Sequence, residues 1–239
     1  MKERLDKILV DKNLVKTRSQ AKSLIEKGDV LVNGKRKTKA GELFSPDEEF
    51  NITSKIYVGR GAFKLEKALE IFSISVKDLT ILDVGASTGG FTQVLLENGA
   101  KKVFAIDVGR DQLDPDLRAD PRVINLEGVN IKDLDLTEFS DGAVIDLSFI
   151  SVTKVLAKVK SLLKPETFVI ILVKPQFEVG IERLPKDGVV KDRGLQETVL
   201  REIETFSRSL GFNVLGSIDS PIEGKLGNRE FLTYLKRLD

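Results

Sequence analysis

The stretch that decides the fold is Thr80-Ile81-Leu82-Asp83-Val84-Gly85-Ala86-Ser87-Thr88-Gly89-Gly90-Phe91. A mainly apolar run leads directly into a glycine-rich turn, after which the apolar spacing becomes helical. A buried strand followed by a tight turn and a helix is the unit from which parallel α/β sheets are built. The glycines let the backbone approach a ligand closely, although a simple tight turn would have a similar composition.

Strand and helix patterns alternate on both sides of this stretch. A helix is predicted at 62–72, and further apolar strands are predicted at 103–107, 123–126, 143–146 and 168–173, with a helix at about 197–210. This alternation predicts an α/β fold with a doubly wound parallel sheet. Only a loop separates the last two strand patterns, 212–218 and 231–235, so these strands should pair antiparallel.

The first part of the chain has a different pattern. Two short helices are predicted, the second capped by Thr17 or Ser19 and ended by Gly28, and the dipeptide Asn33-Gly34 predicts a β-hairpin. We therefore expect a small α+β domain at 1–55, a linker at 56–61 and a larger α/β domain at 62–239.

Composition excludes several chemistries. The 239 residues contain neither Cys nor His, which removes thiol nucleophiles, disulfides, Cys/His zinc sites and imidazole bases. The longest apolar run, Phe168 to Val173, is far below the roughly 20 residues that a spanning helix needs, and the N-terminus is charged. We therefore expect a cytoplasmic protein without a membrane partner.

Basic charge is concentrated at the front of the chain. The net charge is only +1, but residues 1–40 hold 12 Lys or Arg against 5 Asp or Glu. Clustered cations of this kind indicate a polyanion partner, and a solvated helix face is the competing interpretation.

The glycine-rich turn favours one cofactor. Asp83 opens the turn, no lysine is present for a phosphate, and Asp107 closes the next strand 22 residues after Gly85. An acidic residue at that distance accepts from ribose hydroxyls, and an acidic turn suits a cationic ligand. The stretch resembles motif I of the class I methyltransferases, which implies S-adenosylmethionine and a seven-stranded Rossmann-like domain. The cofactor-binding residues are then expected to be Asp83, Gly85, Ser87, Thr88, Gly89, Gly90, Asp107, Asn130 and Asp146.

The methyl acceptor follows by elimination. Methylation of pyrimidine C5 needs a Cys nucleophile, and an exocyclic amine acceptor would require an Asp-Pro-Pro-Tyr-like tetrad where this chain has Asp146-Leu147-Ser148-Phe149. A hydroxyl remains, and a ribose 2′-hydroxyl needs a positioned base. Lys174, at the end of an apolar strand, is the candidate base, and a solvated lysine is the alternative interpretation.

The N-terminal module resembles the S4 RNA-binding domain. The resemblance is carried by Arg4-Leu5-Asp6, Thr17 to Ala21 and Gly28 to Gly34, with Lys35 and Lys37 following. It implies that the module binds structured RNA, chiefly ribosomal RNA. The residues expected to contact RNA are Arg4, Lys7, Arg18, Lys22, Lys35 and Lys37, with Arg60 in the linker.

Motifs along the whole chain are similar to those of the TlyA-type (haemolysin A) ribosomal RNA 2′-O-methyltransferases, which join an S4 domain to an FtsJ-like domain. They include Gly59 to Leu65, Asp146 to Ser151, Val173 to Gly180 and Gly227 to Phe231. The resemblance implies a catalytic tetrad of Lys64, Asp146, Lys174 and Glu230, with no metal. Lys174 would be the base, oriented by Asp146, while Lys64 would keep it neutral and position the hydroxyl.

The resemblance also bears on the target. Where FtsJ-like enzymes often place an acidic residue near the adenine, this chain has Gly128-Val129-Asn130, so Asn130 is expected there. The chain ends nine residues after Glu230, and short members are associated with a cytidine of the large ribosomal subunit. A non-enzymatic RNA-binding factor and a membrane-active haemolysin are the alternative functions.

Overall fold

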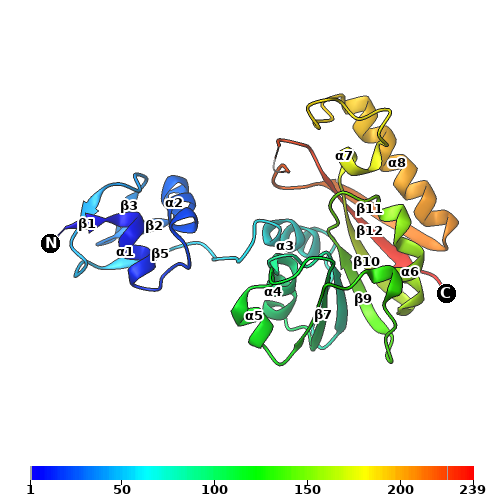
Figure 1. Cartoon of the computed structure of the whole chain (residues 1–239), viewed down its shortest axis with the longest axis horizontal. Coiled ribbons are helices and arrows are strands. Elements are labelled where there is room, and N and C mark those ends of the chain that lie inside the picture. The colour runs from blue at the N-terminus through cyan, green and yellow to red at the C-terminus, as the bar shows by residue number, and fades with distance from the viewer. Residues whose placement is uncertain (1, 225) are drawn as a thin grey trace. The chain divides into compact units, whose positions relative to one another are not determined.

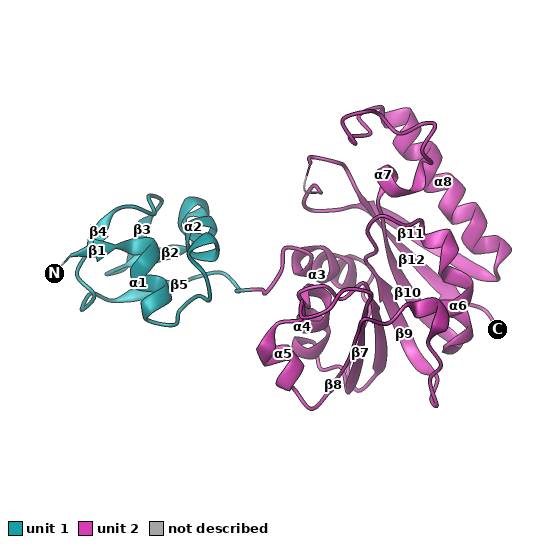
Figure 2. Cartoon of the chain, viewed as in Figure 1, with its two compact units in different colours: residues 1–56 teal, residues 57–239 magenta. Residues whose placement is uncertain are grey.

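The computed structural model describes residues 2–224 and 226–239, and the chain divides into two compact units, up to Ile56 and from Tyr57 onward (Figure 2). The first unit is a small α+β fold. Its elements are β1 (Glu3–Arg4), α1 (Leu5–Asp11), α2 (Arg18–Lys27), β2 (Val30–Val32), β3 (Lys35–Lys37), β4 (Leu43–Phe44) and β5 (Phe50–Ile52).

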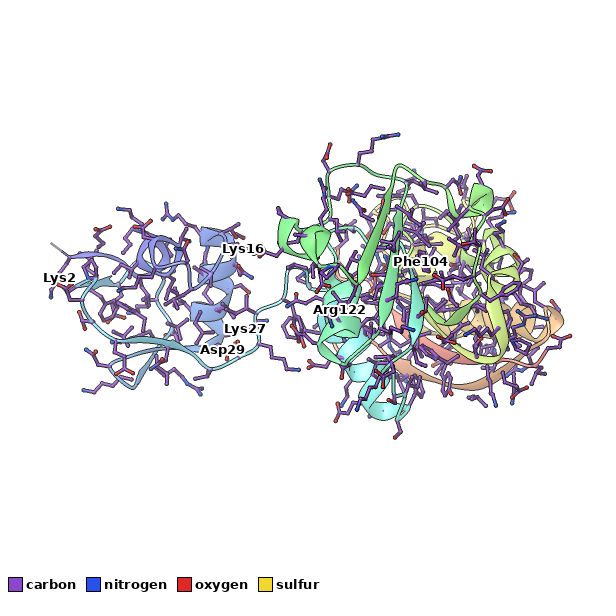
Figure 3. All side chains as sticks on the ribbon, turned by 90° about the horizontal axis from the view of Figure 1, so that it is seen from below. Lys2, Lys16, Lys27, Asp29, Phe104 and Arg122 are labelled. Atoms are coloured by element: carbon purple, nitrogen blue, oxygen red, sulfur yellow. The ribbon has the colours of Figure 1, made fainter. Side chains whose placement is uncertain are left out.

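Local signals in the sequence explain the first unit. The Thr17 side chain accepts from the Gln20 N–H at the start of α2, and Gly28 ends this helix in the left-handed conformation. The hairpin of β2 and β3 turns at Asn33 and Gly34, which both have positive φ, as a tight two-residue turn requires. Lys2, Lys16 and Lys27 lie at the periphery of this unit (Figure 3).

The second unit is a sheet with helices on both faces (Figure 1). Its helices are α3 (Ala62–Ile71), α4 (Gly90–Glu97), α5 (Pro115–Ala119), α6 (Leu156–Ser161), α7 (Pro175–Glu178) and α8 (Arg193–Ser209), with short 3-10 turns at Ile131–Asp133 and Val152–Lys154. The strands are β6 (Thr80–Val84), β7 (Lys102–Asp107), β8 (Val123–Glu127), β9 (Ser140–Ile145), β10 (Leu163–Val173), β11 (Phe212–Asp219) and β12 (Phe231–Arg237).

Within the described residues, seven strands form this sheet in the order β11-β12-β10-β9-β6-β7-β8. The strands from β6 to β10 pair in parallel, whereas β12 pairs antiparallel with both β10 and β11. The predicted α/β architecture, including the antiparallel end, is confirmed. The order reverses between β6 and β9, and ligands of doubly wound sheets bind outside the carboxyl ends of the strands at such a point.

Successive residues of β6 face opposite sides of the sheet, which gives two cores. Ile81 packs with α3 and α4 on one side, and Leu82 packs with α6 and α8 on the other. A strand covered on both faces is mainly apolar, which explains the run that precedes the glycine turn. Every helix in the described part of the chain is too short or too polar to cross a membrane.

The glycine-rich turn brings β6 against the end of β9. Gly85 has φ +91°, and a Cβ on it would lie 2.3 Å from the Asp146 carbonyl oxygen. Gly89 has φ +95°, and a Cβ there would lie 2.3 Å from Leu117 Cδ1. Both positions therefore favour glycine for the backbone conformation, and Gly85 also requires it for space, because the atom that a Cβ would meet there belongs to the backbone.

We expect Gly85→Ala to destabilise the second unit much more than Gly180→Ala does. Gly180 also has positive φ, at +79°, but no atom lies within 4 Å of a Cβ built there. In the Gly180→Ala control, the free energy of unfolding should fall only by the cost of placing an alanine in the left-handed conformation, about 1–2 kcal/mol. Gly85→Ala must in addition displace the Asp146 carbonyl, which should lower it further. Urea unfolding measures both, and equal losses would show that the approach to Asp146 is not tight.

Candidate active site

A cavity of about 850 Å³ lies in the second unit, at the carboxyl ends of β6, β9 and β10. Side chains of all four predicted tetrad residues line it, together with Gly85, Ser87, Thr88 and Gly90 of the turn and with Arg60. Asp83, Gly89, Asp107 and Asn130 are not among its lining residues. The cavity thus contains the expected reacting groups and one side of the expected cofactor site.

The four tetrad side chains form two ion pairs. Lys174 Nζ lies 2.6 Å from Asp146 Oδ1, and Lys64 Nζ lies 2.5 Å from Glu230 Oε2. Both lysine side chains are only 9% exposed. Buried ammonium groups need partners, because removing an unpaired charge from water is very costly.

Strand ends and register place these residues. Asp146 follows β9, and its N–H donates to the Val84 carbonyl at 2.9 Å, so the strand pairing continues to this residue. Lys174 follows β10, and Val173 is paired with Phe231 at the start of the antiparallel β12. Glu230 directly precedes Phe231 and therefore lies at the same edge of the sheet as Lys174.

Lys64 comes from α3, outside the sheet. Gly61 precedes this helix, and a Cβ on Gly61 would lie 3.5 Å from Asp146 Oδ2. Gly90 packs more closely, because a Cβ there would lie 3.1 Å from the Ala62 nitrogen. These contacts hold α3 next to the turn and bring Lys64 to Glu230.

Ser148, Gln176 and Phe177 were not predicted as site residues. Lys174 Nζ donates to Ser148 Oγ at 3.0 Å and lies 5.8 Å from the centre of the Phe177 ring. Gln176 Nε2 lies 3.5 Å from Glu230 Oε1. The signal that could have identified them is their position, since Ser148 follows Asp146 by two residues after β9, and Gln176 and Phe177 follow Lys174 by two or three residues in α7.

Asp107 holds the turn beside the cavity. Its Oδ2 accepts from the Ser87 N–H at 2.8 Å, and its Oδ1 accepts from the Gly109 N–H at 2.7 Å. Asn130 caps a 3-10 turn, accepting from the Lys132 N–H at 3.1 Å. Both residues therefore fix backbone around the expected cofactor site.

Asp83 was expected to face a cationic ligand, but it does not line the cavity. It lies beneath the glycine-rich turn. It is fully buried on the helix-covered sheet, and Thr92 Oγ1 donates to its Oδ2 at 2.6 Å. Burial raises the pKa of Asp83 to about 7, and the negative charge of Asp146 acts in the same direction, while the Thr92 hydrogen bond opposes it.

The predicted RNA-contacting cations of the first unit mostly have acidic partners. Asp6 binds Arg4 and Arg18, while Lys7 pairs with Glu3, Lys22 with Glu26 and Lys37 with Glu42. Lys35 is exposed on β3. Most of the cations expected to contact RNA are therefore held in ion pairs on the surface of this unit.

Comparison with known proteins agrees with this geometry. Residues 57–237 match the FtsJ-like methyltransferase model, and residues 3–50 match the S4 domain model. The chain belongs to the FtsJ-like methyltransferase family. Its S4 domain precedes the FtsJ-like domain, as the sequence motifs predicted.

Similar proteins span nearly the whole chain. The 16S/23S rRNA (cytidine-2'-O)-methyltransferase TlyA of Mycobacterium tuberculosis is 39% identical over 98% of this chain and 89% of its own length. The 23S rRNA (cytidine-2'-O)-methyltransferase TlyA of Campylobacter jejuni is 36% identical over 94% of this chain and 96% of its own. A solved structure of a protein named as a hemolysin, from Streptococcus thermophilus, has a TM-score of 0.76 at 42% identity and covers 100% of this chain and 89% of that one.

We expect Asp83 to make the stability of the FtsJ-like domain fall as pH rises. Its pKa is raised in the fold, so the unfolded chain loses the proton first, and stability present below about pH 4 is lost progressively up to about pH 7. Each pKa unit corresponds to about 1.4 kcal/mol, so the total effect is a few kcal/mol. Asp83→Asn should remove this part of the pH dependence of the free energy of unfolding, measured with urea.

Thr92→Val provides the matched control. It removes the hydrogen bond that lowers the Asp83 pKa, so it should extend the loss of stability to higher pH. A pH profile of Asp83→Asn that is identical to that of the unmodified chain would contradict the assignment.

Proposed function

We propose that this chain transfers a methyl group from S-adenosylmethionine to the 2′-hydroxyl of a cytidine in ribosomal RNA. The Lys174–Asp146 ion pair carries the proposal, because it places an amine beside the glycine turn in an open cavity. The names of the two TlyA relatives supply the substrate, and 23S rRNA is the target that both names share. An rRNA substrate would place the protein in the cytoplasm.

The residues around the turn fit this cofactor. Each Asp107 carboxylate oxygen accepts one backbone N–H, and each retains a lone pair that could accept from a ribose hydroxyl. Asn130 uses its amide oxygen as a cap, which leaves the amide nitrogen to donate to the adenine. The backbone of Gly85, Ser87, Thr88, Gly89 and Gly90 and the Asp146 carbonyl would border the rest. When bound, S-adenosylmethionine supplies an electrophilic methyl group.

Lys174 is the proposed base. In its neutral amine form it would take the proton of the ribose 2′-hydroxyl, and Asp146 would stabilise the ammonium group that results. The Ser148 contact at 3.0 Å and the Asp146 contact at 2.6 Å fix the position of Nζ from two sides. Fixed geometry of this kind can contribute roughly 7–11 kcal/mol to lowering a reaction barrier.

Two roles were expected for Lys64, which are keeping Lys174 neutral and positioning the hydroxyl, and its ion pair with Glu230 favours the second. Because Glu230 lies 2.5 Å from its Nζ, the carboxylate offsets much of the lysine charge, and a repulsive effect on Lys174 is weakened. We assign Lys64 to positioning the substrate, since an ammonium group has three donors and Glu230 uses one of them. Glu230 holds Lys64, and Gln176 braces Glu230 from the other oxygen.

We expect Lys174→Ala and Lys174→Arg both to lower methyl transfer by about 10²- to 10⁴-fold, because a positioned base contributes about that much. An arginine can retain the ion pair with Asp146 but does not release its proton at accessible pH. Transfer of tritiated methyl groups to unmethylated large ribosomal subunits measures the rate. Near-normal turnover of Lys174→Arg would exclude Lys174 as the base and direct attention to Lys64.

We expect Asp107→Ala to weaken S-adenosylmethionine binding at least tenfold, since hydrogen bonds to a charged group are worth about 1.5–3 kcal/mol each. Calorimetry on the purified chain measures this affinity. Asp135→Ala is the control, because the Asp135 side chain is 98% exposed and is not among the residues that line the cavity. Undiminished affinity in Asp107→Ala would remove Asp107 from the ribose-contacting role.

A further inference from the structure

Asp6 is the buried centre of an ion-pair cluster in the S4 domain. It is 4% exposed, and it accepts from Arg4 Nε at 3.0 Å and from Arg4 Nη2 at 3.1 Å. Arg18 Nη2 donates to the same carboxylate at 2.7 Å. The hydrogen bonds from Arg4 lower the pKa of Asp6 to about 2, and those from Arg18 contribute, so the carboxylate stays charged at any physiological pH.

The cluster presents only positive charge to solvent. The Asp6 side chain is 6% exposed, whereas the side chains of Arg4 and Arg18 are 52% and 58% exposed. Each guanidinium has five N–H donors, and neither uses all of them on Asp6. Gly41 leaves room for Arg4, since a Cβ there would lie 3.3 Å from Arg4 Nη1.

We propose that Asp6 is a positioning residue that holds Arg4 and Arg18 together as a clamp for one phosphate of the RNA backbone. The inference rests on the proposed RNA substrate. Arginine binds phosphate through two parallel hydrogen bonds, which requires a fixed orientation of its planar group. Holding two flexible side chains before binding reduces the entropy that binding must otherwise lose.

The other paired cations of the domain differ from this cluster. Lys7, Lys22 and Lys37 each pair with a carboxylate that is itself at least 30% exposed. Such pairs are weak and are easily exchanged for a phosphate. The Asp6 carboxylate is buried, so its arginines stay where it holds them.

Two hypotheses predict opposite effects of Asp6→Asn on the affinity for RNA: one in which only the number of charges matters, and one in which Asp6 positions the arginines. Removing a negative charge should tighten binding to RNA if the number of charges decides affinity. If Asp6 holds the clamp, the same change should weaken binding, although the domain becomes more positive. Glu26→Gln is the matched control, because it removes one negative charge in the same way from an exposed side chain of α2.

The experiment measures binding of the full chain to 23S rRNA transcribed in vitro, at several salt concentrations. We expect Asp6→Asn to bind about tenfold more weakly than the unmodified chain, and Glu26→Gln to bind equally or more tightly. S-adenosylmethionine affinity should not change in either variant. Thermal unfolding followed by circular dichroism shows whether Asp6→Asn still folds.

Arg18→Lys keeps the test valid if Asp6→Asn fails to fold. Because the Arg18 side chain is exposed, we expect this variant to fold. The substitution keeps the positive charge but removes the planar guanidinium group. We expect it to weaken binding severalfold, whereas Arg36→Lys on exposed β3 should have no effect.

The outcomes are distinguishable. If the unmodified chain binds the transcript and Arg18→Lys binds equally well, with Asp6→Asn equal or tighter when it folds, Asp6 only joins α1 to α2 and the clamp is wrong. If the unmodified chain does not bind the transcript, the proposed RNA substrate is wrong, and the clamp with it.

Discussion

The candidate active site depends on the close approach of two backbone segments, at Gly85 and at Asp146. The Asp146 N–H donates to the Val84 carbonyl, and the Asp146 carbonyl fills the space where a side chain on Gly85 would lie. The glycine turn and the end of β9 are thereby fixed to each other through the main chain. A contact between flexible side chains would fix them less well, because each side chain adds rotatable bonds.

The antiparallel strand β12 completes the site. Asp146 and Lys174 follow parallel strands and so lie at the carboxyl edge of the sheet. A residue that precedes a strand can lie at this edge only if its strand runs antiparallel to the others. Glu230 precedes β12 and reaches that edge for this reason. A parallel β12 would place Glu230 at the opposite edge, far from Lys174. The departure from the all-parallel pattern therefore has a direct consequence for the chemistry.

The spacing of apolar residues and the turn residues were sufficient to predict the strands of the large sheet and its antiparallel end. They also predicted a small first domain, but not its short strands β1 and β4. They could not predict which lysine pairs with which acid, since Lys64 and Glu230 are 166 residues apart and meet only through packing. The burial of Asp83 was open to prediction, because it lies within a strand covered on both faces. The expectation that Asp83 contacts the ligand came instead from its place in motif I. The hydrogen bond from Thr92 explains how the protein interior accommodates this carboxyl group.

The S4 domain shows why a count of charges is a poor guide to a binding surface. Arg18 and Lys22 lie four residues apart on α2 and count equally in the basic front of the chain. Their partners differ in burial, since the Glu26 side chain is 57% exposed and that of Asp6 is 6% exposed. Lys22 can leave Glu26 at little cost, because water solvates both groups once they separate. If Arg18 left Asp6, the buried carboxylate would lose one of its two arginine partners and keep only Arg4. That loss is costlier than the separation of an exposed pair, so a phosphate should bind to Arg18 in the orientation that Asp6 imposes.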